Sequence, residues 1–149
     1  MAGPSTSTDT KHLLAEAQSE FLQDFEYRGS VADGDKHKFY NDIDVFVFPT
    51  RYRNEAQPLV LFEAMGHGVP VVAYNRGCIA DDLAHAGIAV ARDRDFAQTV
   101  APVLAQWDAN RQTLESASKT ALKRAEQAYA EGQSDLDRLM NELTGGQDQ

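Results

Sequence analysis

The chain has 149 residues, enough for one domain with a sizeable core, and its 42% hydrophobic and 25% charged residues are typical of a globular protein. Its formal net charge of −9 disfavours nucleic acid and anionic lipid as partners, but small phosphorylated ligands remain open because backbone amides can hold them. The single cysteine, Cys78, excludes an internal disulfide and a cysteine-based zinc site. Since neither a signal peptide nor a membrane-length apolar run is visible, we expect a cytoplasmic protein without a membrane span.

The spacing of apolar residues predicts alternating helices and strands up to residue 91. Apolar residues three or four positions apart indicate helices, and short apolar runs indicate buried strands. In chain order the predicted elements are a helix at 9–22, a strand at 25–29, a helix at 33–42, a strand at 44–49, a helix from 58, a strand at 69–74, a helix at 79–85 and a strand at 87–91. This alternation implies an α/β fold, with a parallel sheet and helices on both of its faces.

Individual residues predict where several of these elements begin and end. Thr8 or Asp9 can cap the first helix, and Pro58 suits the first position of the helix that it opens. Gly68 fits the left-handed position that ends the same helix. The apolar run at 44–49, stopped by a proline, is typical of a central strand buried on both faces.

Beyond the last strand the chain is expected to be helical. The predicted helices lie at 96–107 with Pro102 inside, at 114–129 with Gly132 as a break after it, and at 136–143. We therefore divide the chain into a Rossmann-like domain at 1–92 and a helical tail at 93–149, which packs on that domain or extends beyond it.

The front of the predicted sheet is short. About four strands can be counted, and no full strand precedes the first helix. An open doubly wound sheet usually has about five or six strands and binds its ligand in a crevice that needs both sides. We therefore expect a domain truncated at its start, with exposed apolar surface that favours self-association.

Two glutamates flank the start of the helix that Pro58 opens. Glu55 lies three residues before Pro58, and Glu63 lies five residues after it, roughly 7–8 Å along the helix axis. The helix start can hold a diphosphate through free N–H groups, while each carboxylate accepts hydrogen bonds from hydroxyls beyond one end. Alternatively, Glu55 forms salt bridges with Arg51 or Arg53, and Glu63 is a solvated helix residue. Spacing alone leaves both interpretations open.

The sequence around these glutamates also carries a family pattern. The two glutamates are separated by seven residues, and Ala-Met and then Gly-Val-Pro-Val-Val follow the second one, while a strand with Pro-Thr-Arg precedes the first. This pattern resembles the C-terminal, donor-binding domain of retaining GT-B glycosyltransferases, and the best fit is the large family 4, glycosyl transferases group 1. The resemblance covers roughly residues 3–91 and, weakly, the helical tail. It implies a partial Rossmann-like sheet of the GT-B type.

The resemblance also implies roles for the matching residues. Glu55 would be the catalytic residue, binding hydroxyls of the donor sugar and steadying charge near the anomeric carbon, and Glu63 would hold the ribose hydroxyls. Gln57, Pro58 and Leu59 would present their backbone to the diphosphate. The loop of Gly29, Ser30 and Val31 would lie near the base. The nucleotide diphosphate sugar would be the donor substrate, and neither a metal nor another cofactor is implied.

Two parts of the family pattern are not found in the chain. These are the acceptor-binding N-terminal domain and an early stretch of the donor domain that carries a basic pair; Arg51 and Arg53 either replace that pair in part or form loop salt bridges. We expect the donor-binding half of a glycosyltransferase, which transfers a sugar to an unknown acceptor with retention. The alternative is a non-catalytic remnant or an interaction subunit whose partner carries the acceptor domain.

Overall fold

The computed structural model describes residues 1–5 and 7–144. Its internal contacts divide the chain into two compact units, Met1–Asp42 and Ile43–Gln149, which we describe one at a time. The boundary predicted at residue 92 separates a Rossmann-like domain from a helical tail, and it stays a prediction.

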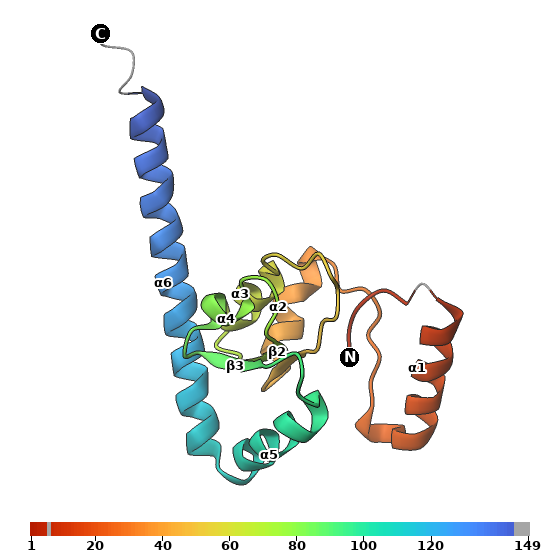
Figure 1. Cartoon of the computed structure of the whole chain (residues 1–149). Coiled ribbons are helices and arrows are strands. Elements are labelled where there is room, and N and C mark those ends of the chain that lie inside the picture. The colour runs from red at the N-terminus through yellow and green to blue at the C-terminus, as the bar shows by residue number, and fades with distance from the viewer. Residues whose placement is uncertain (6, 145–149) are drawn as a thin grey trace. The chain divides into compact units, whose positions relative to one another are not determined.

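The first unit holds two helices, α1 at Thr8–Phe21 and α2 at Asp33–Asn41 (Figure 1). A short 3-10 helix, η1 at Leu22–Asp24, directly follows α1. Both α-helices were predicted, but the N-cap of α1 is Ser7, whose hydroxyl oxygen accepts from the Thr10 backbone N–H at 3.1 Å. The predicted caps, one and two residues later, therefore lie inside the first turn.

The strand predicted at 25–29 is wrong, although this segment is paired with the start of the chain. The Arg28 backbone N–H donates to the Met1 carbonyl at 2.9 Å, and the Gly3 N–H donates to the Gly29 carbonyl at 2.8 Å. These few bonds do not continue into the regular ladder that defines a strand, because the chain turns at Gly29, which has a φ of +66°.

The second unit is built on a parallel sheet. Its strands are β1 at Phe46–Phe48, β2 at Val71–Tyr74 and β3 at Gly87–Val90, in the order β1-β2-β3. Phe46 pairs with Val71, which in turn pairs with Gly87, and both ladders are parallel. The α/β fold with a partial Rossmann-like sheet is therefore confirmed.

The prediction of a central strand at 44–49 is wrong. In the described part of the chain β1 pairs only with β2, so it lies at the edge of the sheet, and Val47 is 42% exposed. The central strand is β2, in which all four residues are buried. An apolar run shows that a strand is suited to burial, but its place in the sheet depends on which other strands pair with it.

Helices cover both faces of this sheet, as predicted. The short helices α3 at Leu59–Gly66 and α4 at Ile79–Leu83 lie on one face, and α5 at Phe96–Ala109 lies on the other (Figure 1). The core on the α5 side joins residues of β2 and β3 to α5 and to the first turn of the last helix: Val72, Tyr74, Val90, Val100, Trp107 and Leu114. Pro102 is accommodated within α5.

The last helix, α6, runs without interruption over Arg111–Thr144, so the break predicted at Gly132 is wrong. Glycine costs a helix about 1 kcal/mol relative to alanine, which is too little to stop a helix that propagates cooperatively on both sides. The first part of α6 packs on the unit, where Leu114 and Ala121 are buried, whereas Leu139 and Leu143 are at least half exposed. Within the described residues, none of the helices combines the length and apolar character that crossing a membrane requires.

Candidate functional site

The carboxyl ends of the three strands lead into three loops of the second unit. In a parallel sheet these ends lie at one edge, which is where open α/β sheets bind their ligands. The loop after β1 covers residues 49–58 and leads into α3, the loop after β2 covers 75–78, and the loop after β3 covers 91–95. The five site residues predicted between Glu55 and Glu63 all lie in the first of these loops or on α3.

Glu55 is half buried, and its carboxylate is held by a neighbouring hydroxyl. Thr50 Oγ1 donates to Glu55 Oε2 at 3.3 Å, and the Glu55 backbone N–H donates to the Tyr52 carbonyl at 3.4 Å. Within the described residues no ion pair joins the Glu55 carboxylate to Arg51 or Arg53, so the salt-bridge alternative is not what the structure shows. One carboxylate oxygen remains without a hydrogen bond to the described chain.

A buried aspartate fixes the approach to α3. Gln57 Nε2 donates to Asp82 Oδ1 at 2.9 Å, and Asp82 is only 6% exposed. Arg124 of α6 contacts the backbone of the same aspartate, because its Nε donates to the Asp82 carbonyl at 2.9 Å. Since a buried carboxylate that loses a partner is costly, this contact restrains Gln57 at the helix start.

Pro58 is the N-cap of α3, one position before the place predicted for it. It is buried, and its carbonyl accepts from the Leu61 N–H at 3.1 Å, which closes the first turn. Leu59, the first helical residue, is 68% exposed. The other end of α3 is as predicted, because Gly68 has a φ of +71° and its N–H donates to the Met65 carbonyl at 2.9 Å.

Glu63 is half buried on the second turn of α3. The ring Nδ1 of His67 lies 2.8 Å from the Glu63 carbonyl oxygen, which ties the end of the helix to the turn that carries the glutamate. The structure therefore places Glu55 before α3 and Glu63 within it, in the order that their spacing predicts.

Gly77 lets the loop after β2 press against the loop that carries Glu55. A Cβ at residue 77 would lie 2.4 Å from the carbonyl oxygens of both Glu55 and Ala56, and the backbone has a φ of +50°. The Cys78 N–H donates to the Ala56 carbonyl at 2.9 Å. This contact was not predicted, and the only signal for it in the sequence is a glycine between the strand predicted at 69–74 and the helix predicted at 79–85.

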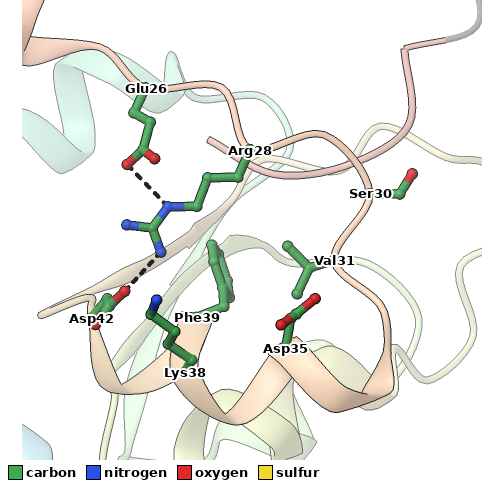
Figure 2. A pocket seen from close by; sticks show the side chains of 8 residues that line it. All are labelled: Glu26, Arg28, Ser30, Val31, Asp35, Lys38, Phe39 and Asp42. Atoms are coloured by element: carbon green, nitrogen blue, oxygen red, sulfur yellow. Dashed lines mark hydrogen bonds and ion pairs between the residues drawn. The ribbon is translucent and has the colours of Figure 1, made fainter.

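Ser30 and Val31, predicted to lie near the base, line a cavity of about 320 Å³ in the first unit (Figure 2). Gly29 precedes them. Phe39 of α2 adds an apolar wall, and the remaining lining residues are polar: Glu26, Arg28, Asp35, Lys38 and Asp42. The volume is within the range of small-molecule pockets, about 300–1,000 Å³.

The arginine of this cavity is neutralised by two carboxylates. Arg28 Nε donates to Glu26 Oε2 at 3.0 Å and Arg28 Nη1 donates to Asp42 Oδ2 at 2.9 Å, as the dashed lines in Figure 2 show. The bond to Glu26 and then the bond to Asp42 raise the pKa of Arg28. The group therefore stays charged, and its charge is matched within the unit.

A smaller cavity, of about 70 Å³, lies in the second unit and is lined by Arg51, Tyr74, Arg76 and Arg92. Arg51 was a candidate from the sequence, whereas Arg76 and Arg92 were not. The signal that could have found them is their position, because each directly follows or nearly follows a predicted strand. In the described part of the chain, no three His, Cys, Asp or Glu side chains gather closely enough to hold a metal ion.

Comparison with known families assigns the chain to a family. The family model described as "Glycosyl transferases group 1" matches residues 1–106, more than half of the 149-residue chain. The chain therefore belongs to the glycosyl transferases group 1 family. No curated protein matches it. The matched range includes every predicted site residue, and family membership implies glycosyl transfer, with a sugar donor and an acceptor.

Proposed function

We propose that the second unit binds a nucleotide diphosphate sugar along the segment from Glu55 to Glu63, as the donor in a glycosyl transfer with retention. The observation that carries the proposal is the arrangement of two half-buried carboxylates around the start of α3, at the ligand-binding edge of a parallel sheet. The restraints on this segment from Gly77 and Asp82 support it, because a fixed loop loses little entropy when a ligand binds.

The start of α3 suits the diphosphate. Helix N-termini carry unpaired N–H groups and a partial positive charge, so they favour anions. In the chemical step, the same partial charge would stabilise the departing diphosphate, where negative charge accumulates. Gln57, Pro58 and Leu59 would present their backbone on this side of the donor.

The two glutamates suit the ends of the donor. Thr50 holds only one oxygen of Glu55, so the carboxylate can accept from sugar hydroxyls and steady positive charge at the anomeric carbon. Glu63, farther along α3, would accept from the ribose hydroxyls. A hydrogen bond to a charged group contributes about 1.5–3 kcal/mol, so each glutamate should matter measurably.

The contact of Gly29, Ser30 and Val31 with a base is a separate proposal, which concerns the first unit alone. The loop of Gly29, Ser30 and Val31 borders a cavity in which the Phe39 ring provides an apolar wall (Figure 2). A nucleobase is flat and largely apolar on its faces, and it can stack on an aromatic ring. The proposed base contact is therefore tested by Val31→Asp, which should weaken binding of a nucleoside diphosphate.

Calorimetric titration with UDP-sugars and GDP-sugars tests the donor assignment. Glu63→Gln should lower the affinity about tenfold or more, since it removes charge-assisted bonds. Glu115→Gln, an exposed site on α6 with the same change in charge, is the matched control and should leave the affinity within about twofold. Equal affinities for wild type and Glu63→Gln would remove the ribose assignment.

Transfer is measured separately, with radiolabelled nucleotide sugars and candidate acceptors. Retention predicts a product with the anomeric configuration of the donor. If neither transfer nor donor hydrolysis is detected, the chain alone is not a catalyst. Donor binding is decided separately, by calorimetry.

A further inference from the structure

Three arginines, each from the loop after a different strand, meet at the small cavity of the second unit. Arg51 follows β1, Arg76 follows β2 and Arg92 follows β3, and Tyr74, the last residue of β2, completes the lining. No carboxylate is among the lining residues, although the sequence contains 23 acidic and 14 basic side chains. We call this group of four residues the arginine cluster.

Within the described residues, none of the three guanidinium groups forms an ion pair. Arg51 Nη2 donates to the Tyr74 hydroxyl at 3.5 Å, and its Cζ lies 5.8 Å from the centre of the Tyr74 ring. Arg76 Nη1 donates to the Tyr52 carbonyl at 3.5 Å, while Arg76 Nε is buried and has no hydrogen-bond partner in the described structure. The bonds that exist are long, so donors remain available.

Neighbouring carboxylates compensate the charge of Arg51 only weakly. Tyr74 raises the pKa of Arg51, first through its hydrogen bond, and Asp95 adds the smallest contribution. The Asp95 carboxylate already accepts from the Gln98 N–H at 2.8 Å as the N-cap of α5. Two unit charges 4 Å apart interact by about 1 kcal/mol in water and by more near a protein surface, so gathered cations favour a bound anion.

The backbone holds parts of the arginine cluster in place. Tyr74 is only 5% exposed, and its ring packs against Phe96 at 4.8 Å between centroids. Arg76 directly precedes Gly77, whose tight contact with the carbonyls of Glu55 and Ala56 fixes the loop. A cluster with a fixed frame loses less entropy on binding than one on mobile loops.

We propose that Arg51, Arg76 and Arg92 form a binding site for a phosphoryl group. The planar guanidinium presents paired donors that match phosphate oxygens, which makes arginine well suited to this ligand. The cavity of about 70 Å³ is several times the ~10–15 Å³ that one water requires, but it is too small for a nucleotide. It therefore takes the phosphoryl group alone, with the rest of the ligand outside. The inference does not depend on Glu55 or Glu63.

Titration of the full chain with inorganic phosphate at low salt tests the site. The variant Arg51→Gln/Arg92→Gln removes two exposed members of the cluster. The matched control, Arg53→Gln/Arg94→Gln, changes exposed arginines of the same two loops that do not line the cavity, with the same change in net charge. We expect the first variant to lose at least tenfold in affinity and the control to stay within twofold, with similar melting temperatures.

Two results would overturn the proposal. One is a wild-type chain that shows no saturable binding of phosphate at millimolar concentration. The other is an equal loss in both double variants, which would mean that phosphate responds to overall charge rather than to the arginine cluster.

A second titration, with UDP present at saturation, distinguishes the source of the phosphoryl group. If UDP competes with phosphate, and its own affinity falls in Arg51→Gln/Arg92→Gln, the group is part of the nucleotide. If phosphate binds equally well with UDP bound, the group belongs to another molecule. Phosphate binding in a chain that binds neither UDP-sugars nor GDP-sugars would retain the phosphoryl site while removing the proposed donor function.

Discussion

Each of the two units has a cavity lined by arginine, but the arginine charge is paired with carboxylates in the first cavity and not in the second. In the first unit Arg28 donates to Glu26 and Asp42 at 3.0 and 2.9 Å, so the charge is matched internally. In the second unit three arginines line a cavity without a carboxylate in its wall. The residue type is the same, but only the second arrangement has charge left for a ligand.

Arginine content alone therefore does not identify an anion site. Arg28 lies in the larger cavity and its donors are used for structure, whereas the smaller cavity concentrates positive charge in an acidic chain. Partnering, rather than cavity size, separates a structural arginine from a binding one. Changes to the backbone, to the partner carboxylates of Arg28 and to the pH each test this difference between the two cavities.

The largest effect is expected from Gly77→Ala, which forces apart the loops that support the arginine cluster. A positive φ costs an L-residue about 1–2 kcal/mol, and the added Cβ would also lie 2.4 Å from two carbonyl oxygens. We expect a loss of about 3 kcal/mol in the free energy of unfolding. Urea unfolding followed by circular dichroism measures it.

Gly29→Ala is the control from the first unit. Its φ is +66°, but nothing lies within 4 Å of the added Cβ, so only the backbone cost of about 1 kcal/mol is expected. Equal losses for Gly77→Ala and Gly29→Ala would contradict the tight contact between the two loops of the second unit.

A smaller effect is expected from removing the partners of Arg28. In the background Arg51→Gln/Arg92→Gln, the changes Glu26→Gln and Asp42→Asn should raise the affinity for phosphate about tenfold, because the Arg28 donors become available. Surface ion pairs contribute little to stability, so the unit should remain folded. Calorimetry measures the change.

The matched control for this test is Asp108→Asn/Glu115→Gln in the same background. It removes two exposed carboxylates and changes the net charge equally, but it does not touch either cavity. A rise of equal size in the control would show that Arg28 is not special and that pairing with Glu26 and Asp42 does not decide its availability.

The smallest effect is expected from pH. The pKa values of Arg28 and Arg51 are both raised from values that are already high, so each arginine stabilises its contacts below the unfolded-state pKa and loses this contribution only in strong alkali. Affinity for a phosphate monoester, which stays dianionic above about pH 7, should change by less than twofold between pH 8 and 10. A steep fall would show that phosphate binds through a group that loses its proton in this range rather than through arginine.

Local patterns predicted much of the fold. Gly68 has the left-handed backbone expected of a helix end, and the apolar run that forms β2 is buried throughout. Both depend on a few consecutive residues. The edge position of β1 depends on distant pairing, and α6 continues through Gly132 because one glycine is a small cost to a helix of 34 residues.

The site was predictable only where its residues share one segment. Glu55 and Glu63 flank the start of α3 because their spacing fixes their places on a loop and a helix. The arginine cluster comes from three loops that only the pairing of the strands brings together. Arg76 and Arg92 were therefore not predictable from residues close together in the sequence. The domain division at residue 92, the cytoplasmic location, self-association and a partner with an acceptor domain stay predictions.

Amide hydrogen exchange, with and without a saturating UDP- or GDP-sugar, tests whether the donor binds between Glu55 and Glu63. We predict slower exchange in residues 55–63 and in the adjoining loop 75–78 when the donor is bound, with no change in residues 130–144 of α6. Unchanged exchange over 55–63, at a concentration where calorimetry shows the donor bound, would contradict it.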